Sequence, residues 1–227
     1  MTVFITQSNY IPWKGYFDAI RQADVFVIYD DMQYTKGDWR NRNKIKTPNG
    51  LQWLTIPVKV KGLDQRINET PVADQLWRKK HWKTIVQNYR NAPHFEKFSS
   101  VFEALYNGQE ERLSDINHRF IIAINKILGI ETRVMQSSEL QLRGDRNEKL
   151  VNICKDLGAS TYLSGPAAKV YLDESQFKAQ GIQVSWLDYS GYPEYPQLYG
   201  NFEHSVSVLD MIFNLGPESI KGIQKTA

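Results

Sequence analysis

The chain has 227 residues, of which 41% are hydrophobic and 23% charged, and its formal net charge is +3. This length is enough to bury an extensive core. The small net charge argues against a dedicated nucleic-acid-binding protein, whose mark is a concentrated basic surface, but it allows a local basic pocket for a small anion. The single cysteine, Cys154, cannot form an intramolecular disulfide, and its helix-spaced apolar neighbours predict a buried thiol rather than a nucleophile.

The N-terminus lacks the basic, apolar and small-residue zones of a signal peptide. No apolar run approaches the ~20 residues that span a bilayer. We therefore expect a cytoplasmic protein without a membrane segment.

The first thirty residues predict a strand, a helix and a second strand. "TVFIT" (2–6) and "DVFVIYD" (24–30) are short runs of β-forming residues, and the segment between them has apolar residues at helical spacing. Such a βαβ unit implies a parallel sheet with a right-handed crossover. Because ligands of these sheets bind beyond the carboxyl ends of the strands, residues 7–15 and 30–44 should meet at one rim.

The rest of the chain predicts a helical middle third followed by alternating helices and strands. Further strands are expected at 53–60, 132–138, 159–165 and 182–189, and helices within 72–128, at 144–158 and at 205–216. Ser114 and Asp145 are the expected N-caps, and Gly129 and Gly158 the expected helix stops. We predict one α/β domain over 1–227, with a nucleotide-binding, parallel βαβ core of the kind that includes nucleotidyltransferase-like folds. Residues 72–128 would form a helical subdomain within it.

The segment "QSNYIPWKGYF" (7–17) lies where the first strand hands over to the helix. A helix N-terminus at this place can hold an anion, Lys14 adds a charge, and Trp13 offers a stacking surface. The alternative is structural: Pro12 sets a turn, Gly15 relieves it, and the aromatic rings pack. A nucleotidylyltransferase would place a histidine motif where "PWKG" stands. The predicted ligand-binding residues of this segment are Gln7, Asn9, Tyr10, Trp13 and Lys14.

The segment "YDDMQYTKGDWRNRNKIK" (29–46) ends the second strand with paired carboxylates, Asp30 and Asp31. Arg40 and Arg42 alternate, so in an extended segment both would face one side, and arginine suits phosphate. A solvated loop is the alternative, although such a loop does not need two aromatic residues. We predict catalytic roles for the two carboxylates, and ligand binding by Gln33, Tyr34, Trp39, Arg40, Asn41, Arg42 and Lys44.

Three further features complete the predicted site. The four histidines have no metal-ligand spacing, so no metal is predicted, and His81 is the better acid–base candidate than His118. Ser164 and Gly165 end a strand and could hold an anion or form only a turn. The tyrosine-rich segment 188–202, with Tyr195 and Gln197, predicts a pocket wall or lid, with a dimer contact as the alternative.

These segments together resemble the WbqC-like protein family. The resemblance is carried by "QSNYIPWKGYFDAI", "ADVFVIYDDMQYTKGDWRNRNKIKTPNG", "WLTIPV", "YLSG", "YPQL" and "SVLDMIFNLGPES", which together cover nearly the whole chain. Family members commonly begin the first motif with His-Gln, whereas Thr6 precedes Gln7 here. The resemblance implies a role in O-antigen or other surface-polysaccharide biosynthesis. It also implies transfer of glycine, or an acylated glycine, to a nucleotide-linked dideoxy amino sugar.

The expected reaction is amide formation on a dTDP-4-amino-4,6-dideoxy sugar, with Asp30, Asp31 or His81 taking the amine proton. The partners would be this sugar nucleotide and a small acyl or aminoacyl donor, and a homodimer is compatible with this function. ATP could form an acyl-adenylate, whereas a thioester or aminoacyl-tRNA donor would not require it. One alternative is nucleotidyl transfer with Mg²⁺ on Asp30 and Asp31. Another is a non-catalytic sugar-nucleotide-binding protein of a polysaccharide assembly complex.

Overall fold

A five-stranded parallel sheet lies at the centre of the protein. The computed structural model describes residues 1–224, and its sheet has the strand order β5-β2-β1-β6-β7, with every pairing parallel. The strands are β1 (Thr2–Thr6), β2 (Val25–Ile28), β5 (Arg133–Gln136), β6 (Thr161–Ser164) and β7 (Gln183–Trp186). The predicted α/β class with a parallel βαβ core is confirmed.

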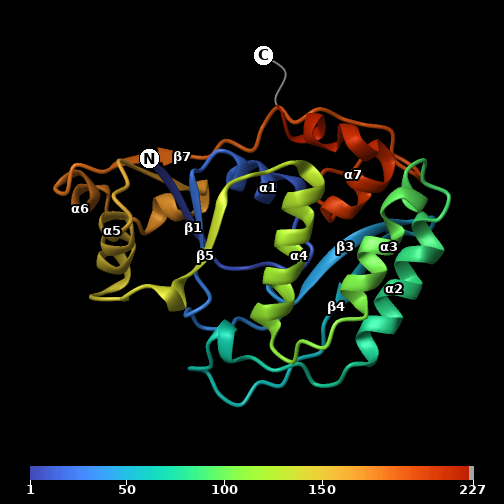
Figure 1. The fold of residues 1–227 in the computed structure, drawn as a ribbon, viewed down its shortest axis with the longest axis horizontal. Coiled ribbons are helices and arrows are strands. Elements are labelled where there is room, and N and C mark those ends of the chain that lie inside the picture. The colour runs from blue at the N-terminus through green and yellow to red at the C-terminus, as the bar shows by residue number, and fades with distance from the viewer. Residues whose placement is uncertain (225–227) are drawn as a thin grey trace.

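Helices cover both faces of this sheet, because successive strand residues point to opposite sides. Phe4 and Phe26 join a core cluster with α1 (Lys14–Arg21), α4 (Leu113–Leu128) and α7 (Val208–Leu215). Val3 and Val25 join a second cluster with α5 (Arg146–Asp156) and α6 (Glu174–Lys178). In Figure 1, α5 and α6 lie to the left of the sheet, and α1, α4 and α7 lie to its right.

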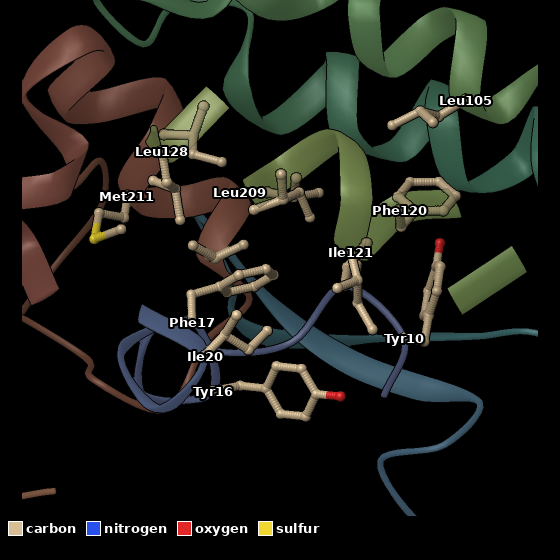
Figure 2. Close-up of a cluster of buried hydrophobic side chains, with 14 of the residues drawn as sticks. Tyr10, Tyr16, Phe17, Ile20, Leu105, Phe120, Ile121, Leu128, Leu209 and Met211 are labelled. Atoms are coloured by element: carbon tan, nitrogen blue, oxygen red, sulfur yellow. The ribbon is translucent and has the colours of Figure 1, made fainter. Parts of the chain in front are cut away.

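The predicted helical segment contains α2 (Leu76–Tyr89), α3 (Phe95–Tyr106) and α4. All three contribute side chains to the core cluster that also holds α1. Figure 2 shows this continuity: Phe17 and Ile20 of α1 lie below Leu128 and Leu209, while Tyr10 points up beside Phe120. That residues 72–128 form a helical subdomain stays a prediction. The short 3-10 helices are η1 (Ile67–Glu69), η2 (Ser137–Glu139), η3 (Pro166–Val170) and η4 (Gly216–Ile223).

A separate antiparallel hairpin lies between the sheet and α2. It consists of β3 (Arg42–Thr47) and β4 (Gly50–Thr55), so the strand predicted at 53–60 begins earlier and ends before Pro57. The segment 42–47, expected to belong to a polar loop, is a strand in which Asn43 and Ile45 point inward and Arg42 and Lys44 point outward. The apolar pattern of the sequence does not predict this strand, because only one of its faces is buried and most of its residues are polar.

The predicted helix ends are mostly correct. Asp145 accepts hydrogen bonds from the backbone N–H groups of Asn147 and Glu148, and Gly129 has φ 67°. Ser114 is not a cap: α4 begins at Leu113, and the Ser114 hydroxyl donates to Asp30 instead. Burial raises the pKa of the Cys154 thiol to about 12, which fits the expected inert thiol.

Candidate functional site

The strand order reverses at β1, which pairs with β2 on one side and with β6 on the other. In an open parallel sheet, the carboxyl ends of the two strands beside such a switch point frame the ligand crevice. The segments that leave β1 and β6 begin with Gln7 and Gly165, respectively. The sheet topology therefore makes the β1–α1 turn the expected place for a binding site.

A cavity of about 260 Å³ opens at this turn. Its walls come from the β1–α1 connection, the loop after β2, strand β3 and the C-terminal loop. The lining residues are Asn9, Pro12, Trp13, Trp39, Asn43 and Ser205. Two indole rings, one proline and three short uncharged polar side chains therefore line the cavity, and none of these lining residues is charged.

The β1–α1 turn is held in a strained conformation. Ile11 has φ 37°, in the left-handed region that a β-branched residue rarely adopts. The Asn43 side-chain nitrogen donates to the carbonyl oxygens of Ile11 at 2.8 Å and Tyr10 at 3.2 Å, and the Tyr10 N–H donates to the Trp39 carbonyl at 3.0 Å. Strain held by neighbouring hydrogen bonds is typical of functional sites. These bonds also confirm that residues 7–15 and 30–44 meet at one rim.

Gly15 makes room for one wall of the cavity. A Cβ atom at this position would overlap the indole ring of Trp13. The same ring contacts Tyr189 and Tyr192 edge-on, with centroid separations of 5.2 and 6.0 Å. The sequence Pro-Trp-Lys-Gly therefore places an indole at the start of α1 and fixes its orientation.

Arg40 supplies positive charge next to the cavity. Its guanidinium donates to Oδ1 of Asn9 and, at 3.1 Å, to Oε1 of Gln7, and it lies 3.6 Å from the Asp38 carboxylate. Arg42 lies instead on the outer face of the hairpin, 4.3 Å from the ring centroid of Trp53. The predicted common face of these arginines fails because β3 begins only at Arg42, so strand alternation does not govern Arg40.

The paired carboxylates take separate partners. Asp30 accepts hydrogen bonds from the Ser8 N–H at 2.8 Å, the Ser8 hydroxyl at 2.6 Å and the Ser114 hydroxyl. Burial raises its pKa, and these hydrogen bonds act in the opposite direction. Asp31 instead accepts from Asn68 and Ser137. Within residues 1–224, no group of three or more His, Cys, Asp or Glu side chains is placed to hold a metal ion.

His81 lies in the core and does not line the cavity. Its Nδ1 is 2.8 Å from the Tyr10 hydroxyl, which is 2.7 Å from the Tyr106 hydroxyl. Burial lowers the pKa of His81 to about 4, so the ring is neutral at neutral pH. This network ties α2 and α3 to the β1–α1 turn.

Lys14 is buried within an aromatic cage and fastens the C-terminal loop to α1. Its Nζ donates to the Pro193 carbonyl at 3.0 Å and lies 5.2 to 5.4 Å from the rings of Tyr192, Tyr195 and Phe202. Burial lowers the pKa of Lys14 to about 8. This lysine therefore stabilises the loop at the base of the cavity wall.

Several other predicted residues also lie outside the cavity lining. Tyr195 donates to Asp210 and accepts from Gln197. Three other predicted residues donate hydrogen bonds to backbone carbonyl oxygens. The Gln33 side chain donates to Leu63 and the Asn41 side chain to Ile56. The Tyr34 backbone N–H donates to Gln65. Ser164 and Gly165 lie at the end of β6, with the Tyr189 hydroxyl beside Gly165.

Three lining residues were absent from the predicted set. Pro12 and Asn43 belong to the two segments that the sequence singled out, and the buried face of β3 selects Asn43. Ser205 had no local signal, since it reaches the cavity only because the C-terminal loop folds back. The Ser207 N–H fixes that fold by donating to the Lys44 carbonyl at 2.9 Å.

Comparisons with known proteins show which family this chain resembles over most of its length. The family model described as "WbqC-like protein family" matches residues 7–222. The uncharacterized protein Rv1507c of Mycobacterium tuberculosis is 49% identical over 219 residues, which are 96% of this chain and 95% of that protein. No solved structure matches the chain significantly. None of the helices within residues 1–224 is long and apolar enough to cross a membrane.

Proposed function

Since the chain belongs to the WbqC-like protein family, we propose that it is an enzyme of surface-polysaccharide biosynthesis that forms an amide on a nucleotide-linked amino sugar. The observation that supports this best is the composition of the cavity. Trp13 and Trp39 provide flat apolar surfaces for the C–H face of a sugar ring. The Asn9 side-chain nitrogen and the Ser205 hydroxyl make no hydrogen bond within residues 1–224, so both can bind sugar hydroxyls.

The size and charge of the cavity support binding of the sugar rather than the phosphates. Pockets for drug-sized ligands usually have volumes of roughly 300–1,000 Å³. The cavity, at about 260 Å³, suits one sugar ring, and its lining carries no charged side chain. A neutral sugar amine can occupy it without an unpaired buried charge.

In the proposed reaction, the neutral sugar amine attacks the carbonyl carbon of an activated acyl group. The new C–N bond forms, the bond from the acyl carbon to its leaving group breaks, and the amine nitrogen loses a proton. Glycine or an acylated glycine is the proposed acyl group. ATP would be required if the enzyme activates a free acid as an acyl-adenylate, but not with a thioester or aminoacyl-tRNA donor.

We propose His204 as the proton acceptor. It precedes the lining residue Ser205 and is largely exposed; the partial burial of its ring and the nearby Lys14 charge lower its pKa. The imidazole is therefore neutral near pH 7 and able to accept a proton. Among the titratable neighbours of other lining residues, Asp38 already accepts from the Trp39 N–H and pairs with Arg40.

The test is incubation of the protein with a dTDP-4-amino-4,6-dideoxy sugar, glycine and ATP, followed by mass spectrometry. The expected product carries one added glycyl residue, and His204→Gln should slow its formation by about 100-fold. His118→Gln, in the middle of α4, is the matched control and should keep the rate. Release of pyrophosphate without an added acyl group would indicate nucleotidyl transfer. Tight sugar-nucleotide binding without turnover of any donor would indicate a non-catalytic protein.

A further inference from the structure

The outer side of the β3–β4 hairpin and the loop beside it carry two indole rings and two cations. We name this surface the hairpin face: Trp39, Arg42, Lys44 and Trp53. The two indole rings have centroids 5.4 Å apart and planes inclined by 38°, and each residue is 41% exposed. Lys44 Nζ lies 5.4 Å from the Trp53 ring centroid and 5.8 Å from that of Trp39. Such exposure is unusual for adjacent tryptophans and indicates a binding surface.

In the part of the chain that the structure describes, the two cations of the hairpin face have no anionic partner. Within residues 1–224, neither the Arg42 nor the Lys44 side chain forms an ion pair or a hydrogen bond. Arg42 is held between the Trp53 ring and Gly37, and its buried Nε lacks an acceptor. An unsatisfied buried donor is destabilising, so an arginine fixed in this way is prepared for an acceptor from a ligand.

We propose that the hairpin face binds the nucleoside diphosphate part of the sugar nucleotide. The base would stack on the exposed indole surface, and the diphosphate oxygens would accept from the Arg42 fork and the Lys44 ammonium. Trp39 belongs to both the hairpin face and the cavity, so the attached sugar can enter the cavity. The identity of the ligand as a sugar nucleotide rests on the proposed function.

Three probes separate the two halves of this ligand. Isothermal titration calorimetry and tryptophan fluorescence would compare the binding of dTDP, thymidine and inorganic pyrophosphate to the whole protein. Since dTDP engages both the rings and the cations, it should bind more tightly than either fragment and quench the fluorescence. Its affinity should fall as the salt concentration rises, because the phosphate contacts are ionic.

The hairpin-face variants have matched control variants on strands of the five-stranded sheet. Removal of both cations by Arg42→Ala with Lys44→Ala should weaken dTDP binding by about tenfold or more, and Trp53→Ala should weaken it by roughly tenfold. Arg133→Ala on β5 and Trp186→Ala on β7 should leave the affinity unchanged. Arg42→Lys retains the positive charge but lacks the guanidinium fork. This variant should therefore bind dTDP more weakly than the wild type and more tightly than the variant without both cations.

The proposal is overturned if the hairpin-face variants bind dTDP like their controls, or if an oligothymidylate binds far more tightly than dTDP. Its failure can be told apart from failure of the proposed function. If these variants lose dTDP binding but the wild-type protein forms no amide, the nucleotide site stands and the reaction does not. If amide forms and the same variants bind dTDP normally, the reaction stands and the hairpin face does not hold the nucleotide.

Discussion

The side-chain nitrogen of Asn43 donates a hydrogen bond to the carbonyl oxygen of Ile11 at 2.8 Å. This contact fastens strand β3 to the strained turn that follows β1. The Asn43 side-chain oxygen accepts from the Lys44 N–H at 2.8 Å, so both ends of the amide are used. One side chain therefore holds together two walls of the cavity and the start of the hairpin face.

Replacement of Asn43 by Asp should destabilise the protein and weaken ligand binding. The carboxylate would face the carbonyl oxygens of Ile11 and Tyr10 without a donor, which we expect to cost about 3 kcal/mol in the free energy of unfolding. Urea denaturation followed by circular dichroism would measure this loss. Asn49→Asp, at the exposed hairpin turn, is the control and should have little effect. An unchanged urea midpoint for Asn43→Asp would contradict this role.

The Gly15→Ala variant tests whether the room left for Trp13 matters. Alanine favours a helix by about 1 kcal/mol over glycine, so α1 itself should not suffer. The added methyl group overlaps the indole ring, so Trp13 should move and sugar-nucleotide affinity should fall by about tenfold. Calorimetry measures the affinity, and the tryptophan emission reports the displacement. Gly62→Ala, where an added Cβ meets no atom of residues 1–224 within 4 Å, should behave like the wild type.

Asp30→Asn distinguishes a catalytic carboxylate from one that positions the turn. The three hydrogen bonds that Asp30 accepts favour positioning, and Asn retains the shape and one acceptor oxygen. We expect turnover to change by less than about tenfold, whereas loss of a general base lowers rates by about 10² to 10⁴. Asp30→Ala, which leaves Ser8 and Ser114 without their acceptor, should lower the stability by about 3 kcal/mol. A loss of turnover above 100-fold in a folded Asp30→Asn protein would restore the catalytic role predicted from the sequence.

Acid should destabilise the protein through His81. Its pKa is about 4 in the folded state and 6.5 in an ordinary environment, so only the unfolded chain takes up the proton between these values. The contribution to stability is complete above pH 6.5 and is lost as the pH falls toward 4. This lowering of the pKa of His81 corresponds to about 3 kcal/mol in the free energy of unfolding.

Urea midpoints at pH 7, 6, 5 and 4 would measure this dependence. His81→Gln should flatten it, because the variant has no proton to take up at this site. His118→Gln leaves the buried His81 ring in place, so this variant should retain the pH dependence of the urea midpoint. Equal pH profiles for the wild type and His81→Gln would assign the acid sensitivity to other groups.

The sequence alone predicted the succession along the chain of the strands and helices that build the five-stranded sheet, because these buried elements show the apolar patterns that local physics requires. It also located two of the segments that line the cavity, 7–17 and 29–46, since the carboxyl ends of parallel strands must share one rim. Asp145 and Gly129 fixed helix ends through local hydrogen bonding and backbone conformation, which need no tertiary context.

Only the tertiary structure decided which polar side chains face the cavity. Asp30, His81 and Lys14 look like reactive groups in the sequence, but each is buried with partners that lie far away along the chain. Ser205 reaches the cavity only through the fold of the C-terminal loop, and Arg42 lies on the outer hairpin face because β3 begins there. The physical reason is that the sequence specifies the chemical type of each polar residue, whereas the burial and the hydrogen-bond partners of that residue depend on contacts between distant segments of the chain.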